Sequence, residues 1–372
     1  MRGKKGGAAM RSLAVSFPRT ERTKAHWKKK FPEMIATAEQ QTLAKVWDEA
    51  ATRGTPANAF DAEMAAFVGD PFRGTDRRRV LGPGETALSI EKRAAEQAMA
   101  AAGLTASDID LMIVHSFLAD QIGVGNAAFL SGELGLKGAA WNLETACTST
   151  VVALQTASAL VRAGEYRNVL CVISCTYSRA ADEDDSVSWF LGDGAAAFVV
   201  SEAPEDQGLL GVKVVNTAVT CGTFYYDLVN EPPERGPRVR MLASPRTGKV
   251  LRDTAQPFLI ECCEGALAAA GKKLSDIDFV VANTPTRWFA SFVSRALGFD
   301  RSRVADTHEL YANIGPVLTP VNLHHTAHAG LIKPGDLVLL YAIGSVSSAG
   351  AAVMRWGDVA LGPMPAPPEV VE

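Results

Sequence analysis

The chain repeats part of itself at a fixed distance. Residues 98–114 read AMAAAGLTASDIDLMIV, and residues 266–282 read ALAAAGKKLSDIDFVVA, without a gap at an offset of 168 positions. Each copy predicts an alanine-rich helix, a glycine that ends it (Gly103 and Gly271), an S-D-I-D turn and an apolar strand. This period is far too long for a solenoid unit and predicts a duplicated domain.

More segments pair at the same offset. The apolar strand that begins near Arg167 matches the one near Gly335, and strands at 195–200 and 351–354 close the two halves. Strands that alternate with helices favour mostly parallel sheets with both faces covered. We therefore expect an α/β fold of five layers, α-β-α-β-α. Residues 1–205 should form one half and residues 206–372 the other.

Four further segments are distinguished by their composition or by the lack of a counterpart in the other half. Residues 19–79 match nothing in the second half and contain a predicted amphipathic helix at 36–51. Residues 217–245 are polar and are interpreted as a linker or surface excursion. The acidic run at 182–185 predicts a solvated loop, and residues 363–372 a proline-rich tail.

Composition excludes several classes. The net charge is −4, so nothing in the overall field favours nucleic acid. No stretch approaches about 18 uncharged apolar residues, so no membrane span is expected. Met1 to Lys5 lack the apolar run of a signal peptide and predict a disordered tail. The six cysteines show neither paired zinc spacing nor a small secreted framework, which predicts a reducing, cytoplasmic setting.

The duplication also predicts a pocket. In such sheets, ligands bind beyond the carboxyl ends of the strands. The offset places Asn313 opposite Thr145, and Asn283 opposite His115. The loops that carry these residues should therefore face each other across a pseudo-twofold axis.

Cys147 is the candidate nucleophile. Small polar residues separate it from a predicted helix at 151–163. A helix N-terminus favours a thiolate and lowers the pKa of the thiol, and a thiolate attacks thioesters well. On spacing alone, a small buried residue at a strand–helix turn is an equal alternative.

Several motifs resemble ketoacyl-acyl-carrier-protein synthase III, a family with the thiolase fold. They agree with it in order and spacing over residues 75–357. The motifs are ETACTSTVVALQTASALVRAG from residue 144, WFLGDGAAAF from 189, YANIG from 311, IKPGDL from 332 and GAAVMRW from 350. The resemblance implies a thiolase-like fold, a homodimer, and coenzyme A or phosphopantetheine thioesters as substrates, without a permanent cofactor or metal. It makes Cys147 the acyl carrier.

The resemblance also supplies the partners of Cys147. Family members use a Cys-His-Asn triad. Asn313 matches the asparagine, but the histidine position holds Asn283. Asparagine cannot act as a base near neutral pH. His308, on the expected strand before Asn313, and His115 are therefore candidate bases, and a histidine satisfied by backbone is the alternative for each.

Further site residues follow from the same resemblance. The oxyanion hole should use the backbone N–H groups of Cys147 and Ser345. Arg77, Arg78 and Arg79 fall where family members contact coenzyme A phosphates, although a plain surface cluster is equally possible. The family's adenine-stacking tryptophan is missing here. His324 and His328 lie one helical turn apart, and we interpret them as a helix face rather than a metal site.

Three functions remain open. The first is a ping-pong acyltransferase of specialised metabolism, such as polyketide biosynthesis, which loads Cys147 from coenzyme A or a carrier protein and transfers the acyl group to an acceptor. The second is decarboxylative condensation with a malonyl thioester. The third is a non-catalytic partner subunit, which the missing histidine permits and the retained Cys147 opposes.

Overall fold

The computed structural model describes residues 7–52, 56–344 and 347–372 of the chain. Within these ranges, no helix is both long and apolar enough to cross a bilayer. The expected disordered tail at Met1 to Lys5 lies outside the described residues.

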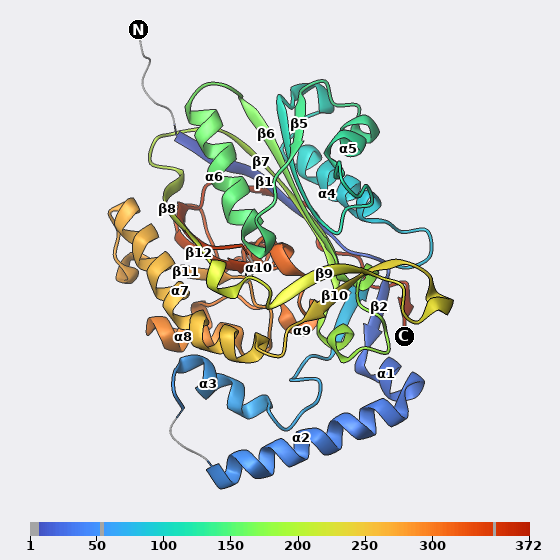
Figure 1. Ribbon diagram of the computed structural model, residues 1–372. Helices are drawn as coiled ribbons and strands as arrows, with labels where there is room; N and C mark the ends of the chain where they lie inside the picture. The colour runs from blue at the N-terminus through green and yellow to red at the C-terminus, as the bar shows by residue number, and fades with distance from the viewer. Residues whose placement is uncertain (1–6, 53–55, 345–346) are drawn as a thin grey trace.

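A ten-stranded mixed sheet organises the molecule (Figure 1). One side consists of β5 (Ala139–Asn142), β4 (Leu111–Phe117), β6 (Asn168–Thr176), β7 (Asp193–Ala203) and β1 (Gly7–Ser16), in that order. The other consists of β11 (Phe279–Ala282), β12 (Leu337–Gly344), β13 (Ser348–Arg355) and β8 (Gly208–Asn216). The two sides join where β1 pairs with β8 at Ala8 and Gly208, and β14 (Ala360–Leu361) pairs with β1.

The duplication is visible in the order and direction of the strands. On one side β4–β6 is parallel, while β6–β7 and β7–β1 are antiparallel. On the other, β11–β12 is parallel, while β12–β13 and β13–β8 are antiparallel. The strands near Arg167 and Gly335, predicted as a repeated pair, are β6 and β12. The predicted α/β duplicated fold is confirmed.

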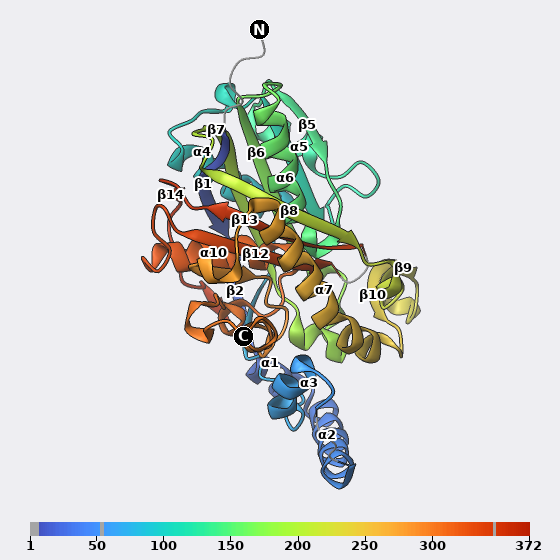
Figure 2. The same cartoon turned by 90° about the vertical axis from the view of Figure 1, so that its left-hand side faces the viewer.

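Helices form three layers around the two sides of the sheet (Figures 1 and 2). The central layer holds α6 (Ser149–Arg162) and α10 (Leu318–His328). One outer layer holds α4 (Ala87–Ala101) and α5 (Ala127–Leu134), and the other holds α7 (Thr247–Ala270) and α8 (Phe289–Leu297).

The strand residues alternate between these layers. On β4, Leu111 and Ile113 belong to the central apolar cluster, whereas Met112 and Val114 pack in the outer cluster with α4. On β12, Leu340 faces the central layer and its neighbours face α7 and α8. Because strand side chains alternate between faces, each sheet is buried on both sides, which gives the expected five layers.

The predicted glycine stops hold in both copies of the repeat. Gly103 follows α4 with a φ of 65°, and Gly271 follows α7 with a φ of 62°. The left-handed backbone at each lets the N–H groups there bond the last helical carbonyls. The turn after each glycine leads into the strand that the repeat predicts.

The segments outside the repeat form additions to this core. The N-terminal one contains β2 (Thr20–Thr23), α1 (Lys24–Lys30), α2 (Pro32–Thr52), α3 (Ala59–Met64) and β3 (Arg77–Val80), and α2 projects from the body in both views (Figures 1 and 2). The proline-rich tail ends in β15 (Val370–Val371), which pairs with β2. The polar excursion is a hairpin of β9 (Phe224–Val229) and β10 (Arg238–Ala243).

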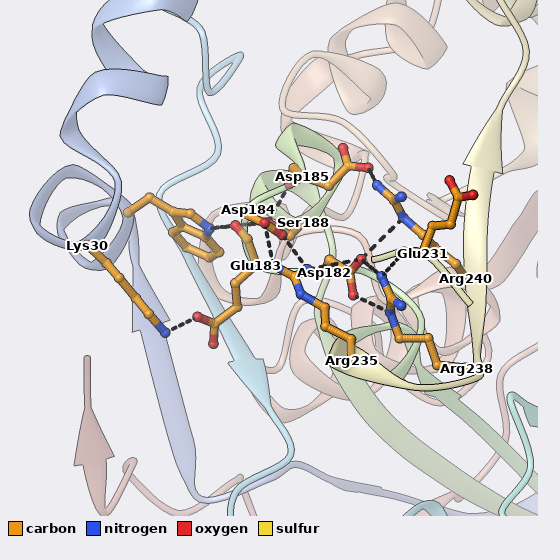
Figure 3. A network of polar contacts seen from close by, with 11 residues as sticks. Lys30, Asp182, Glu183, Asp184, Asp185, Ser188, Glu231, Arg235, Arg238 and Arg240 are labelled. Atoms are coloured by element: carbon orange, nitrogen blue, oxygen red, sulfur yellow. Dashed lines mark hydrogen bonds and ion pairs between the residues drawn. The ribbon is translucent and has the colours of Figure 1, made fainter. Parts of the chain in front are cut away.

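The acidic run at 182–185 is not a solvated loop, as the sequence predicted, because it pairs with this hairpin (Figure 3). Arg238 donates to both carboxylate oxygens of Asp182, at 3.0 and 2.6 Å. Arg235 bonds Asp184 in the same way at 2.9 and 2.6 Å, and Arg240 contacts Asp185. Bidentate arginine–carboxylate pairs fix geometry as well as charge, so this loop holds the hairpin to the core.

Candidate functional site

Cys147 lies in a sharp turn at the start of the central helix α6. A short 3-10 helix, Ala146–Thr148, presents it, and Ala146 takes a left-handed φ of 52°. Non-glycine residues adopt this conformation rarely and at a cost. The next turn is fixed by Thr148, whose hydroxyl donates to the Ser348 carbonyl at 2.6 Å. The nucleophile loop is therefore tied to the C-terminal half.

The thiol meets an aromatic wall. The Cys147 sulfur lies 3.9 Å from the Tyr177 hydroxyl. Tyr177 packs edge-on against Phe117 at 5.3 Å, and Phe117 packs against Tyr226 of the hairpin at 5.5 Å between ring centroids. The hairpin thereby contributes a ring to the aromatic cluster that adjoins the thiol.

Asp193 holds the turn that carries Tyr177. Its carboxylate accepts from the Ser178 N–H at 2.9 Å and the Leu81 N–H at 2.8 Å. Burial raises the pKa of Asp193 to about 6 despite these bonds. These contacts give Asp193 a structural role in holding the two turns together.

The pKa of the Cys147 thiol does not follow the sequence prediction. Burial raises it to about 11, the hydrogen bond with Tyr177 opposes that rise, and the nearby Glu144 carboxylate adds to it. The helix N-terminus alone suggested a lowered pKa. Removing a thiolate from water outweighs that favourable dipole here.

The Asn313 loop packs against the Cys147 loop, as the repeat predicts. It leads into a 3-10 helix, Gly315–Val317, and Thr150 of α6 donates to the Pro316 carbonyl at 2.8 Å. Gly315 occupies the position that the offset pairs with Cys147. A Cβ there would lie 3.1 Å from both the Tyr177 hydroxyl and the Cys175 sulfur.

Both asparagines of the predicted site have their side-chain oxygens occupied. Asn313 Oδ1 accepts from the Gly315 N–H at 2.9 Å, and Asn283 Oδ1 accepts from the Ile343 N–H at 3.1 Å. An amide whose oxygen is held by backbone directs its NH₂ group the other way. Asn283 is buried, and it positions the chain at the end of β12.

His308 lies in the first turn of α9 (His308–Tyr311), not on a strand. The ring is buried, with Nδ1 2.9 Å from the Thr284 carbonyl and Nε2 3.0 Å from the Thr75 hydroxyl. Burial lowers its pKa to about 4. Both ring nitrogens are thus committed, which favours the alternative of a histidine satisfied by its surroundings.

The loop between β12 and β13, which begins at Gly344, reaches the Cys147 backbone. Gly344 N–H donates to the Thr148 hydroxyl at 3.0 Å. A Cβ on Gly344 would lie 3.1 Å from the Cys147 nitrogen and 2.9 Å from the Thr145 carbonyl oxygen. The backbone here can approach so closely only without a side chain. Ser345, the predicted second oxyanion donor, lies outside the described residues.

The arginine cluster divides into one exposed and two buried residues. Arg77 is exposed, at the start of β3. Arg78 is fully buried, contacts the Trp189 carbonyl and stacks over Trp27 at 4.4 Å. Arg79 donates to two backbone carbonyls, of Pro18 at 2.8 Å and Ala366 at 2.9 Å. Arg78 and Arg79 therefore do not fit the expected phosphate site. Their guanidinium groups are buried and already donate to backbone carbonyls.

Among the described residues, no group of three or more histidine, cysteine, aspartate or glutamate side chains is arranged to hold a metal. His324 and His328 belong to α10, and His324 is buried with Nε2 3.0 Å from the Gly362 carbonyl.

Sequence reasoning did not find two residues beside the thiol. Tyr177 follows the carboxyl end of β6, where ligand-binding residues gather in such sheets. Glu144 lies three residues before Cys147, within the very segment that carries the nucleophile. These two positions, after a strand end and within the nucleophile segment, were the only sequence signals that could have identified Tyr177 and Glu144.

Models of known families and known proteins match this chain. The model for 3-oxoacyl-[acyl-carrier-protein] synthase III matches residues 141–218, and the model for its C-terminal part matches residues 267–356. The β-ketoacyl-[acyl-carrier-protein] synthase III of Rhizobium meliloti is 31% identical over 293 residues, which cover 76% of this chain and 88% of that protein.

Solved structures share the fold. The 3-oxoacyl-(acyl carrier protein) synthase III of Pseudomonas aeruginosa superposes with a TM-score of 0.76 at 20% identity, covering 94% of this chain and 98% of that one. The priming β-ketosynthase of the R1128 polyketide pathway gives 0.77 at 21% identity, covering 95% and 98%. With its repeat, its motifs and these relatives together, the chain belongs to the 3-oxoacyl-acyl-carrier-protein synthase III family of thiolase-fold acyltransferases.

Proposed function

We propose that this protein is a ping-pong acyltransferase of specialised metabolism, such as polyketide biosynthesis. The observation that carries the proposal is a cysteine at the family's nucleophile position with an asparagine where the family has its histidine. Cys147 accepts an acyl group from a thioester, and a second substrate then removes it. Asn283, whose oxygen is held by the Ile343 N–H, cannot serve as a base.

The donor in this proposal is coenzyme A or an acyl-carrier protein. Arg77, which is exposed on β3, is the remaining candidate of the arginine cluster for a phosphate contact. The oxyanion hole uses the Cys147 N–H and an N–H of the last loop, with Ser345 still the predicted donor. His308 remains a candidate base from the sequence, although its contacts favour a structural role.

We include a homodimer in the proposal, with the two halves divided near residue 205. None of the six cysteines, all within the described residues, forms a disulfide, which suits a reducing compartment such as the cytoplasm.

The test follows the acyl group by mass. Purified protein is incubated with acyl-coenzyme A of several chain lengths, and intact mass is recorded for the protein and for Cys147→Ala. We expect one acyl adduct in the wild type and none in the variant. An adduct that persists in Cys147→Ala, or none at all in the wild type, contradicts the proposal.

Decarboxylative condensation is a second candidate, supported by the two oriented asparagines. Asn283 and Asn313 both present amide NH₂ groups while their oxygens accept from backbone. Two such donors suit the thioester oxygen of a malonyl donor, where negative charge develops. Release of carbon dioxide from a malonyl thioester distinguishes this reaction from simple transfer.

A further inference from the structure

Glu144 carries a carboxylate that is fixed at one end and open at the other. Its Oε1 accepts from the Ala146 N–H at 2.6 Å, and its Oε2 lies 3.3 Å from His115 Nδ1. The Glu144 side chain is 63% exposed, whereas that of His115 is fully buried. The carboxylate is therefore anchored by the Ala146 N–H, lies beside a buried imidazole ring, and is still accessible to a substrate.

The contacts of His115 assign its tautomer. Nδ1 lies 3.1 Å from the Leu143 carbonyl, which can only accept, so this nitrogen carries the proton. Nε2 is buried and has no hydrogen-bond partner among the described residues, which suits a bare lone pair better than a second N–H. Burial also lowers the pKa of His115. The ring is thus neutral and donates from Nδ1.

This arrangement also fixes the loop that carries the thiol. Ser149 Oγ lies 3.0 Å from His115 Nδ1 and accepts from the Thr145 N–H at 3.0 Å. Glu144 and Ser149 thus bracket the turn around Cys147, and both contact the same ring nitrogen. This nitrogen has one hydrogen to share among the Leu143 carbonyl, the Glu144 carboxylate and the Ser149 hydroxyl, so the ring lies at the centre of the polar contacts around the turn.

Glu144 lies within electrostatic reach of the reacting sulfur. Its carboxylate bonds the N–H of Ala146, the residue next to Cys147. The charge of Glu144 also contributes to the raised pKa of the Cys147 thiol and to that of Tyr226. Around the carboxylate, the titratable groups are therefore His115, Cys147 and Tyr226.

Other groups near the thiol are poorer bases. Burial raises the pKa of Tyr177, so its phenol stays protonated and acts as a donor. His308 has both nitrogens engaged. The asparagines cannot take a proton.

We propose that Glu144 is the proton acceptor of the acyl-transfer step and that His115 positions it. This inference rests on the proposed acyl-Cys147 intermediate. It also bridges the duplication, because the offset pairs His115 with Asn283, the position that has lost the family histidine. A base in this place favours acceptors that bear an O–H, N–H or S–H group over a malonyl donor, which loses carbon dioxide without needing a base.

The step balances as follows. The acceptor atom attacks the thioester carbon of acyl-Cys147 while the Glu144 carboxylate takes its proton. The new bond to the acceptor forms, the carbon–sulfur bond breaks, and the Cys147 thiolate leaves. The Glu144 carboxylic acid then returns the proton to the thiolate, so both groups are restored.

The experiment separates loading from transfer. Wild type, Glu144→Gln and Glu133→Gln are acylated with butyryl-coenzyme A, desalted, and followed by intact mass in buffer containing n-propanol. Glu133 is a surface glutamate of α5 that pairs with Lys92 and serves as the matched control. Hydroxylamine, a nucleophile strong enough to need no base, is added to a parallel sample.

We expect Glu144→Gln to load Cys147 within about threefold of the wild-type rate but to lose the acyl group to water and propanol roughly 100-fold more slowly. Its cleavage by hydroxylamine should be unchanged. Discharge of Glu144→Gln at the wild-type rate, or failure of the folded variant to load, overturns the inference. Absence of any adduct in the wild type instead overturns the proposed function.

His115 is tested by conservative rescue. Asparagine can place an amide N–H where Nδ1 lies, and leucine cannot. We expect His115→Leu to transfer roughly 10-fold more slowly and His115→Asn to recover most of that loss, with transfer followed only after each variant has been fully acylated. Equal transfer by the two variants contradicts the positioning role.

Discussion

The raised pKa of Cys147 predicts a thiol that reacts slowly near neutral pH. The pKa of about 11 comes first from burial and is moderated by the hydrogen bond with Tyr177. Alkylation by a small reagent should therefore accelerate continuously from pH 7 to about pH 11. A thiol at an activated helix N-terminus would instead reach its plateau well below pH 8.

The size of the effect follows from two opposing factors. At pH 7, a thiol with a pKa of about 11 is ionised in roughly one molecule in 10⁴, against about 3% for an ordinary thiol with a pKa near 8.5. The ionised fraction is thus about 300-fold smaller. Because nucleophilicity rises with thiol pKa, with a coefficient of about 0.4–0.5, the more basic thiolate recovers roughly tenfold. We expect alkylation about 20- to 30-fold slower than that of free cysteine.

The assay measures iodoacetamide addition by intact mass between pH 6 and 10.5. The exposed Cys221 is replaced by serine in every sample, and Cys147→Ser in that background reports labelling elsewhere. Tyr177→Phe should slow the reaction further, because it removes a hydrogen bond that lowers the thiol pKa. A plateau below pH 8, or a rate at pH 7 equal to that of free cysteine, would refute this reasoning and show that the helix terminus outweighs burial.

Three substitutions test the architecture around the thiol. Gly344→Ala should slow loading of Cys147 roughly 100-fold, as loss of an oxyanion donor does. The reason is that the new Cβ would lie 2.9 Å from the Thr145 carbonyl oxygen and displace the loop. Loading at the wild-type rate would contradict this prediction. Asp182→Ala should lower the free energy of unfolding in urea by about 1–3 kcal/mol, since Arg238 loses both of its bonds to that carboxylate. It should also speed protease cleavage within 230–237. Unchanged cleavage would contradict the role of Asp182 in holding the hairpin to the core. Asp193→Ala should cost about 3 kcal/mol, because two backbone N–H groups lose their acceptor, and Asp193→Asn should recover part of it; a loss below about 0.5 kcal/mol would contradict a structural role.

Much of the fold could be predicted because it depends on local patterns repeated twice. Helix α8, from Phe289 to Leu297, shows such a local pattern, because its apolar face is followed by Gly298 in a left-handed cap. The strands that follow Gly103 and Gly271 appear in both copies with equivalent neighbours. The periodicity and the glycine stops carry this information within a few residues.

What could not be predicted depends on groups distant in sequence. The acidic run and the arginines of β10 each look solvated alone, and only the fold brings Asp182 to Arg238. His308 was expected on a strand, but a four-residue helix leaves too little periodicity to recognise. The pKa of Cys147 is set by burial and by Tyr177, 30 residues away, so the local helix signal misjudged its direction.

The pairing of Cys147 with Gly315 sets the capacity of the enzyme. Duplication gave the chain two equivalent turns, yet the second lacks a side chain, and its φ of 55° disfavours one. A Cβ there would press on the Tyr177 hydroxyl and the Cys175 sulfur at 3.1 Å. Because Gly315 has no side chain, the Tyr177 hydroxyl has room to lie 3.9 Å from the Cys147 sulfur. Under the proposed function, each chain would therefore carry one acyl group at a time, on one of its two equivalent turns.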